Sequence, residues 1–151
     1  MKTLPSIPDS VLRAESVRID PREITDALVA SMFRTMRECG GTGLAAPQLG
    51  LLYRLAVIES DLQRLVLVNP TLAPLGKPKD RVYEDEGCLS LPGRSFSVPR
   101  FPAVKVNWTA GDDRLSLTVT GRLARIVQHE VDHLRGVLVD RVGQEVKDVA
   151  A

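Results

Sequence analysis

The chain has 151 residues, 44% of them hydrophobic, which is enough for one sizeable core, so we expect a single domain over residues 1–151. Basic and acidic residues number 20 and 19, and no basic block or aromatic-basic stripe indicates a nucleic-acid site. Residues 1–8 lack the apolar core of a signal peptide, and no run has the length of a membrane span. The composition therefore predicts a cytoplasmic protein with no membrane partner.

The first expected element is a helix that begins at residues 20–23 and ends at Gly40. Asp20 can cap this helix, Pro21 suits its first turn, and Glu23 completes a capping box. A stripe of apolar residues at four-residue intervals predicts the face that packs on the core. The stripe consists of Ile24, Leu28, Met32 and Met36, with Ala27, Val29 and Phe33 beside them.

Strands are expected next, at residues 55–58, 65–68, 104–108 and 115–119, with a turn at residues 110–112 between the last two. A second helix follows over residues 122–134, where apolar residues recur with helical spacing and Gly136 marks the end. Because the strands cluster between the helices instead of alternating with them, the pattern favours an α+β fold with antiparallel sheets.

Two glycine-containing segments, residues 41–48 and 86–93, are expected to be loops. In the first, glycine permits close approach of the backbone and Gln48 offers an amide N–H to an oxygen, although an ordinary turn would have the same composition. The second contains Cys88, for which a buried structural role is the usual explanation. Cys39 ends the first helix and is expected to pack in the core. In a cytosolic protein we expect neither thiol in a disulfide.

Both histidines of the chain fall within residues 129–133 (HEVDH), on the second expected helix. Residues four apart share a helix face, so His129 and His133 can bind one metal ion with Glu130 beside it. A divalent metal lowers the pKa of a coordinated water, and a neighbouring carboxylate can take the proton as that water attacks a carbonyl. A histidine pair without metal remains the alternative. If a metal binds, Cys88 becomes a candidate third ligand that leaves a fourth position open.

Residues 41–48 (GTGLAAPQ), 86–90 (EGCLS) and 128–134 (QHEVDHL) occur in this order, accompanied by Asn69-Pro70 and by residues 98–100 (VPR). Together these motifs resemble the peptide deformylase family, and the resemblance extends from Ile7 to Val142. It implies antiparallel sheets surrounding a central helix that carries the H-E-x-x-H motif. It also implies metal-dependent hydrolysis of a linear amide, which removes the formyl group from the N-terminal formylmethionine of newly synthesised polypeptides and releases formate.

The resemblance implies a role for each residue of the metal motif. Cys88, His129 and His133 would bind one divalent metal ion, with Fe²⁺ expected and Zn²⁺, Ni²⁺ or Co²⁺ able to take its place. Glu130 would accept a proton from the attacking water and pass it to the leaving amine. One carboxylate would therefore act first as a base and then as an acid.

The resemblance also implies how the substrate is bound. The Gln48 side chain and the Leu89 backbone N–H would stabilise the developing oxyanion. Backbone groups of Thr42, Gly43 and Gly87 would pair with the extended main chain of the substrate, although Thr42 stands where Ile or Val is more usual. The methionine pocket would lie near Ile126 and His129, with two polar residues, Glu84 and Arg122, close by.

The implied partner is an N-formylmethionyl peptide, in the bacterial cytoplasm or in an organelle if the source is eukaryotic. Residues 144–151 are too short for the long C-terminal helix with which some similar proteins dock on the ribosome, so any ribosome contact is expected to be transient. Arg100 and Asp132 are expected either to orient the site or to form surface ion pairs.

Three rival interpretations remain open. A metalloprotease of the H-E-x-x-H class would need a further ligand after His133, which Asp140 or Glu145 would have to supply. A structural metal site would close its shell by adding Cys39 to Cys88 and the two histidines, and would have no catalytic role. An inactive scaffold would share the fold of the family without its activity.

Overall fold

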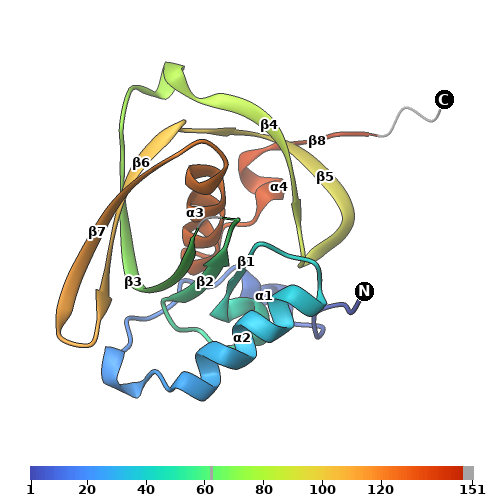
Figure 1. The fold of residues 1–151 in the computed structure, drawn as a ribbon. Coiled ribbons are helices and arrows are strands. Elements are labelled where there is room, and N and C mark those ends of the chain that lie inside the picture. The colour runs from blue at the N-terminus through green and yellow to red at the C-terminus, as the bar shows by residue number, and fades with distance from the viewer. Residues whose placement is uncertain (62, 148–151) are drawn as a thin grey trace.

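The computed structural model describes residues 1–61 and 63–147 of the chain. Figure 1 shows its elements along the chain. The N-terminal half contains α1 (Asp9–Leu12), a 3-10 turn (Pro21–Glu23), α2 (Asp26–Glu38), β1 (Gly43–Ala45), a 3-10 turn (Ala46–Leu49), β2 (Leu55–Glu59) and β3 (Arg64–Pro74). The C-terminal half contains a 3-10 turn (Pro78–Asp80), β4 (Val82–Cys88), β5 (Leu91–Arg100), β6 (Ala103–Ala110), β7 (Asp113–Thr120), α3 (Gly121–Leu134), α4 (Val139–Val142) and β8 (Gln144–Glu145).

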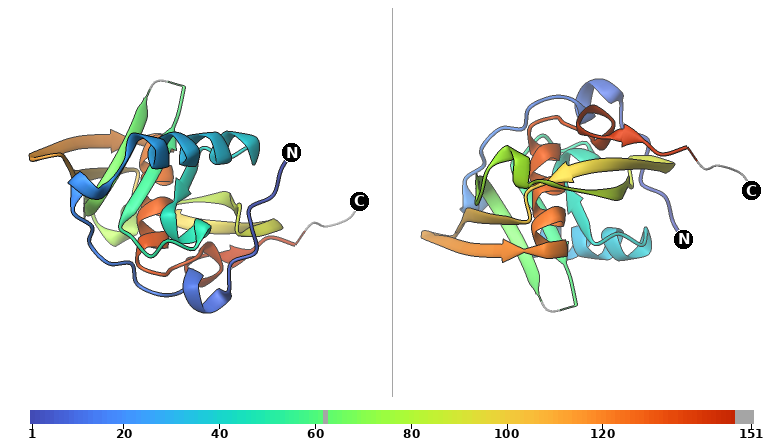
Figure 2. Two further views of the ribbon diagram at one scale, coloured as in Figure 1. Left: turned by 90° about the horizontal axis from the view of Figure 1, so that it is seen from below. Right: turned by 90° about the horizontal axis from the view of Figure 1, so that it is seen from above.

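The strands form two sheets around α3. One sheet has the order β1-β2-β3-β6-β7 and the other β4-β5-β8, with antiparallel pairing throughout both. Figures 1 and 2 agree in placing α3 in the middle, with β6 and β7 on one side and β4 and β5 on the other. The α+β fold expected from the strand pattern is confirmed, and α3 carries the H-E-x-x-H motif. No helix in the described part of the chain is long and apolar enough to cross a membrane.

The central helix is held by its apolar face. Ala124, Val127 and Val131 of α3 are fully buried against a cluster from the larger sheet. The sheet contributes Ile58, Leu67, Val104, Val106 and Val119. Each side chain of this size contributes about 1.5–3 kcal/mol when it is taken out of water. The packing therefore fixes the orientation of α3, and with it the direction in which residues 129–133 point.

The first long helix begins later than its sequence suggests. Asp20 does act as a cap, but it caps the 3-10 turn Pro21–Glu23, and Ile24 is extended (φ −85°, ψ 111°). The Thr25 side chain then accepts a hydrogen bond from Leu28 N–H and starts α2. The helix ends as expected before Gly40 (φ 72°). Its buried residues are Met32, Phe33 and Met36, whereas Ala27, expected beside the stripe, is exposed.

Both segments expected to be loops contain strands instead. Within residues 41–48, the stretch Gly43–Ala45 is β1 and pairs with β2. Within residues 86–93, only Leu89 and Ser90 connect β4 to β5. The acidic residues of β4 and the glycine and two prolines of β5 have low β-strand propensity. Strand propensity alone therefore does not predict this hairpin. The pairing of the two strands decides their conformation, and the basic side chains that neutralise β4 come from elsewhere in the chain.

Asn69, part of the Asn69-Pro70 pair, fastens the N-terminal segment to the larger sheet. Its backbone has φ 48° at an irregularity in the pairing of β3 with β6. Its side chain accepts a hydrogen bond from Ile19 N–H at 3.0 Å and donates one to Ile19 C=O at 2.7 Å. An amide can satisfy both backbone groups at once, which an aliphatic residue could not do.

Candidate active site

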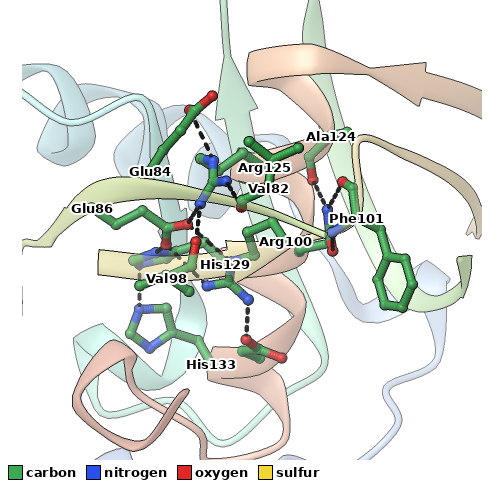
Figure 3. A network of polar contacts seen from close by, with 12 residues as sticks. Val82, Glu84, Glu86, Val98, Arg100, Phe101, Ala124, Arg125, His129 and His133 are labelled. Atoms are coloured by element: carbon green, nitrogen blue, oxygen red, sulfur yellow. Dashed lines mark hydrogen bonds and ion pairs between the residues drawn. The ribbon is translucent and has the colours of Figure 1, made fainter. Parts of the chain in front are cut away.

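Three candidate metal ligands converge from two elements. Cys88 is the last residue of β4, and His129 and His133 lie one turn apart on α3. The two histidine Nε2 atoms are 3.2 Å apart, and Cys88 Sγ is 3.4 Å from His133 Nε2. All three ligand atoms lie within 4.8 Å of one another. Figure 3 shows the two imidazoles facing each other along the helix.

The chemistry of this cluster fits a metal ion. Two imidazole nitrogens and a thiol are the donors that Zn²⁺ and similar divalent ions prefer. Burial lowers the pKa of His133 and keeps its imidazole neutral, which is the form that binds a metal. Burial opposes protonation of His129 as well, but hydrogen bonds with Cys88 and Glu86 raise its pKa to about 10, so a metal ion would compete with this proton.

Glu130 lies beside the cluster and is buried. Its side chain is 4% exposed, and its Oε2 atom has no hydrogen-bond partner within the described residues. Burial raises the pKa of this carboxyl to about 7, despite the nearby charges of His129 and Arg100. A carboxyl with a pKa near neutrality can both accept and return a proton, which is the requirement for a general acid-base.

Gly43 lets the backbone of β1 approach Glu130. A Cβ atom at Gly43 would lie closer to Glu130 Oε1 than real Cβ contacts do, so one of the two groups would have to shift. Only glycine fits at this position without a clash, and the sequence alone did not show which side chain it approaches. β1 forms one wall beside the carboxylate, and α3 forms the other.

Gln48 points its amide nitrogen toward the cluster. Its Oε1 accepts a hydrogen bond from Ala45 N–H at 2.9 Å, so the Nε2 donor must face the other way. Nε2 donates to Ser90 Oγ at 3.1 Å and lies 3.9 Å from Cys88 Sγ. The side chain is 2% exposed and so has little freedom to turn. Ser90, to which the sequence analysis gave no role, thus helps to hold the amide.

Glu86 is the centre of a buried ionic network that sequence reasoning missed (Figure 3). Its Oε1 accepts a hydrogen bond from His129 Nδ1 at 2.9 Å, and its Oε2 accepts from Arg100 Nε at 2.9 Å and from Arg125 Nη1 at 2.6 Å. Burial opposes ionisation of Glu86, but the hydrogen bonds from His129 and Arg100 outweigh it and hold its pKa at about 2. Arg100 also binds Asp132 on α3.

The network decides between the two expectations for Arg100 and Asp132. The Arg100 side chain is 7% exposed and that of Asp132 is 19% exposed, so they do not form a surface ion pair. They connect Glu86 to the helix that carries the histidines. The only available signal was the position of Glu86, two residues before Cys88, and of Arg100 in the VPR motif. Nothing in the sequence pointed to Arg125.

A cleft of about 610 Å³ opens beside the cluster. It is lined by the remaining residues that the resemblance assigned to the substrate, namely Thr42, Gly43, Gly87, Leu89 and Ile126, and by Gln48, Cys88, His129 and Glu130. Arg122 and Arg125 line it as well, whereas Glu84 is not part of the lining. Residues from β1, from the β4–β5 hairpin and from α3 therefore share one cavity.

The residues that the rival interpretations require are engaged elsewhere. Asp140 accepts two hydrogen bonds from Arg13, and Glu145 accepts two from Arg94. Within the described residues, the one group able to hold a metal consists of Cys88 and the two histidines. Cys39 does not belong to it. Both cysteines are free and buried, as expected.

The fold and the site together define a protein of the H-E-x-x-H class in which a strand brings a thiol to the two histidines. A family model described as polypeptide deformylase matches residues 1–148. The chain belongs to this family, and the resemblance based on its motifs is confirmed.

Relatives and solved structures agree with this assignment. A peptide deformylase from Parafrankia sp. is 40% identical over 147 residues, which cover 94% of this chain and 79% of the relative. One from Lachnoclostridium phytofermentans is 40% identical over 153 residues, with coverages of 95% and 90%. A peptide deformylase structure from Synechococcus elongatus in complex with actinonin has a TM-score of 0.79 at 40% identity, with coverages of 93% and 82%. A Met-Ala-Ser-bound class I type b enzyme from Acinetobacter baumannii has a TM-score of 0.81 at 30% identity, with coverages of 93% and 99%.

Proposed function

We infer that this protein is a peptide deformylase, which hydrolyses the N-formyl group of N-formylmethionyl peptides and releases formate. The observation that carries this conclusion is the meeting of two histidines, a thiol and a buried glutamate beside a cleft in a chain of the deformylase family. Residues 1–151 are proposed to act as one catalytic domain. The proposed setting is the bacterial cytoplasm or an organelle, and a transient contact with the ribosome is part of the proposal. The expectation for residues 148–151 lies outside the described residues.

Cys88, His129 and His133 would hold one divalent metal ion. When bound there, the ion would supply Lewis acidity for the water and for the formyl oxygen. The donor set of two nitrogens and one sulfur suits Fe²⁺, which we propose as the native ion, and equally Zn²⁺, Ni²⁺ or Co²⁺. Glu86 would orient His129 for this task, because neutral imidazole that donates from Nδ1 keeps the lone pair of Nε2 toward the cluster.

Glu130 would move the proton. As water attacks the formyl carbon, Glu130 accepts a proton from it, and the carbonyl carbon becomes tetrahedral. Glu130 then gives the proton to the amine nitrogen, the C–N bond breaks, and formate and a free N-terminal amine leave. Its raised pKa, about 7, suits both steps because neither protonation state is strongly favoured near neutrality.

Gln48 and Leu89 would stabilise the negative charge that develops on the formyl oxygen. The Gln48 amide is held in advance by Ala45 N–H and by Ser90, so no reorganisation is needed during the reaction. The Leu89 backbone N–H lies in the two-residue connection after Cys88, within the same cleft. Removing one such donor lowers the rate by about 10²–10³-fold in enzymes that use them.

The substrate main chain would lie extended between the β1 edge and the β4–β5 hairpin. Thr42, Gly43 and Gly87 line the cleft, and their backbone groups would pair with the substrate main chain as neighbouring strands do. Main-chain hydrogen bonds do not depend on the side chains of the peptide, so the cleft would accept many nascent chains. Ile126 would contact the side chain of the formylated residue.

The test is formate release from formyl-Met-Ala-Ser by the protein loaded anaerobically with Fe²⁺, and separately with Zn²⁺ or Ni²⁺. Glu130→Ala is the control, because it keeps the three proposed ligands and removes the proton carrier. We expect release by the parent protein and its loss in the variant while metal content stays the same. Absence of release from every folded, metal-loaded form would overturn the proposed function.

A further inference from the structure

Helix α3 lines one part of the cleft, and Arg122, near the start of this helix, adds a cationic side chain to the lining. Arg122, Ile126 and His129 are spaced by four and three residues, so they lie on one face of the helix, and all three line the cavity. Arg122 lies about 10 Å along the helix axis from His129, at 1.5 Å per residue. A side chain that extended from the cluster along this face would pass Ile126 before it reached Arg122.

Arg122 differs from the other basic side chains of the cleft in having no ionic partner. Lys2 pairs with Glu38, and Arg94 pairs with Glu145. Arg125 is engaged by Glu84 and by Glu86, and it also donates to the carbonyls of Val82 and Val98. Arg122 is exposed and forms no ion pair or hydrogen bond with any residue in 1–61 or 63–147.

The surroundings of Arg122 do not form a purely apolar pocket. Thr42, which bears a hydroxyl group, lines the same cleft, and so does Arg125, one turn from Arg122. Ile126 is the apolar exception on this face of α3. An aliphatic side chain in this position would gain contact with Ile126 but would leave the guanidinium of Arg122 with water alone.

We propose that Arg122 is a specificity residue, through which the cleft binds a formylated residue whose side chain ends in an acceptor oxygen. This inference rests on the proposed function. The chemistry is that of a side chain as long as methionine with a carboxylate or a sulfoxide at its tip, as in glutamate or oxidised methionine. Arginine presents several N–H donors in a fixed plane, and a charged donor strengthens each hydrogen bond to oxygen. A thioether is a weak acceptor and gains much less.

Asp85 is the feature of the cleft that opposes this proposal. It lines the cavity from β4, is exposed, and forms no ion pair within the described residues. If Asp85 determined the side-chain preference of the cleft, substrates with a basic side chain on the formylated residue would react best. The experiment therefore includes a lysine substrate, for which the two residues predict opposite results.

The test compares kcat/KM for formate release from formyl-X-Ala-Ser by the metal-loaded full chain, with X as methionine, norleucine, methionine sulfoxide, glutamate or lysine. Norleucine has the length of methionine and no acceptor. For glutamate and the sulfoxide, we expect the ratio of kcat/KM to that of norleucine to fall on the order of tenfold in Arg122→Leu. Arg122→Lys should keep part of the ratio, since it retains the charge but not the planar donors. Arg34→Leu, an exposed arginine of α2 that does not line the cleft, should match the parent protein.

Equal ratios in Arg122→Leu and the parent protein would overturn the inference, as would a preference for lysine. If either of these results is accompanied by formate release from the methionine or norleucine substrate, the proposed function stays in place. Release from none of the five substrates would instead remove the proposed function and the inference together. Circular dichroism of Arg122→Leu checks the fold, which we expect to be intact because Arg122 forms none of the contacts described above.

Discussion

The Glu86 carboxylate accepts a hydrogen bond from His129 Nδ1 at 2.9 Å on Oε1, while Arg100 donates to both of its oxygens and Arg125 donates to Oε2. A residue of β4 thereby fixes the ring of a candidate metal ligand on α3. Partners of this kind set the tautomer and the direction of an imidazole, and their loss usually lowers metal affinity. Cys88 and His129 are thus brought together by the network around Glu86 as well as by the fold.

We therefore expect Glu86→Gln to weaken metal binding by about 10–100-fold, measured by competition with a chelator. The matched control is Glu84→Gln on the same strand. Glu84 pairs with Arg125 but is 61% exposed and does not contact His129. An equal loss of affinity in both variants would show that charge alone matters, and an unchanged affinity in Glu86→Gln would contradict the orienting role. Far-UV circular dichroism separates weaker binding from unfolding.

The sequence predicts the parts of this site that depend on local spacing, but not the parts that depend on contacts between distant residues. The spacing within residues 129–133 is local, so the histidine pair and its helix could be predicted with Cys88 as a third candidate. The network around Glu86 joins β4, β5 and α3, and Arg100 and Arg125 are distant from Glu86 in sequence. No local periodicity records such contacts. The same holds for the β4–β5 hairpin, whose acidic residues become compatible with a strand only once these arginines are in place.

The contact between Gly43 and Glu130 predicts a steric effect on catalysis. A methyl group at Gly43 would overlap Glu130 Oε1, so Gly43→Ala should displace the carboxylate. Displacements of about 1 Å in a catalytic group can lower rates on the order of 10²-fold, and we expect a loss of this size in kcat. Metal content should stay unchanged.

Gly87→Ala is the comparison for this experiment. A Cβ atom there would meet its nearest neighbour, Arg94 C=O, at 3.8 Å, which is an ordinary contact. Because Gly87 lies along the cleft, we expect its effect mainly in KM. If Gly43→Ala kept the parent kcat, the close approach of β1 to Glu130 would have no catalytic consequence.

The two cysteines provide a direct test of the ligand set. Cys88 Sγ lies 3.4 Å from His133 Nε2, so Cys88→Ser should lose both metal and deformylase activity, measured by metal analysis and formate release. Cys39 is buried but is not part of the three-residue group, so Cys39→Ser should retain the metal. Metal retained by Cys88→Ser would favour the protease interpretation, and metal lost from Cys39→Ser would favour the closed structural site.

The ion pair between Arg13 and Asp140 predicts how acid affects stability. It joins the N-terminal segment to α4 with a distance of 2.7 Å between Nη2 and Oδ2, and both side chains are about three-quarters buried (22% and 25% exposed). The hydrogen bond from Arg13 holds the pKa of Asp140 below its ordinary value. We expect Asp140→Asn to lower the free energy of unfolding at pH 7 by about 1 kcal/mol, measured by urea denaturation.

The sign of the pH dependence follows from the lowered pKa. Asp140 binds a proton more readily in the unfolded chain, so its contribution is complete above the unfolded pKa of about 3.9 and disappears as the pH falls through the lower folded value. The difference in stability between the parent protein and Asp140→Asn should therefore shrink as the pH falls from 5 toward 2. Asp9→Asn is the control, because Asp9 contacts the same arginine but is 72% exposed, and its effect should be smaller at every pH. A difference for Asp140→Asn that stayed constant over this range would show that its charge does not stabilise the fold.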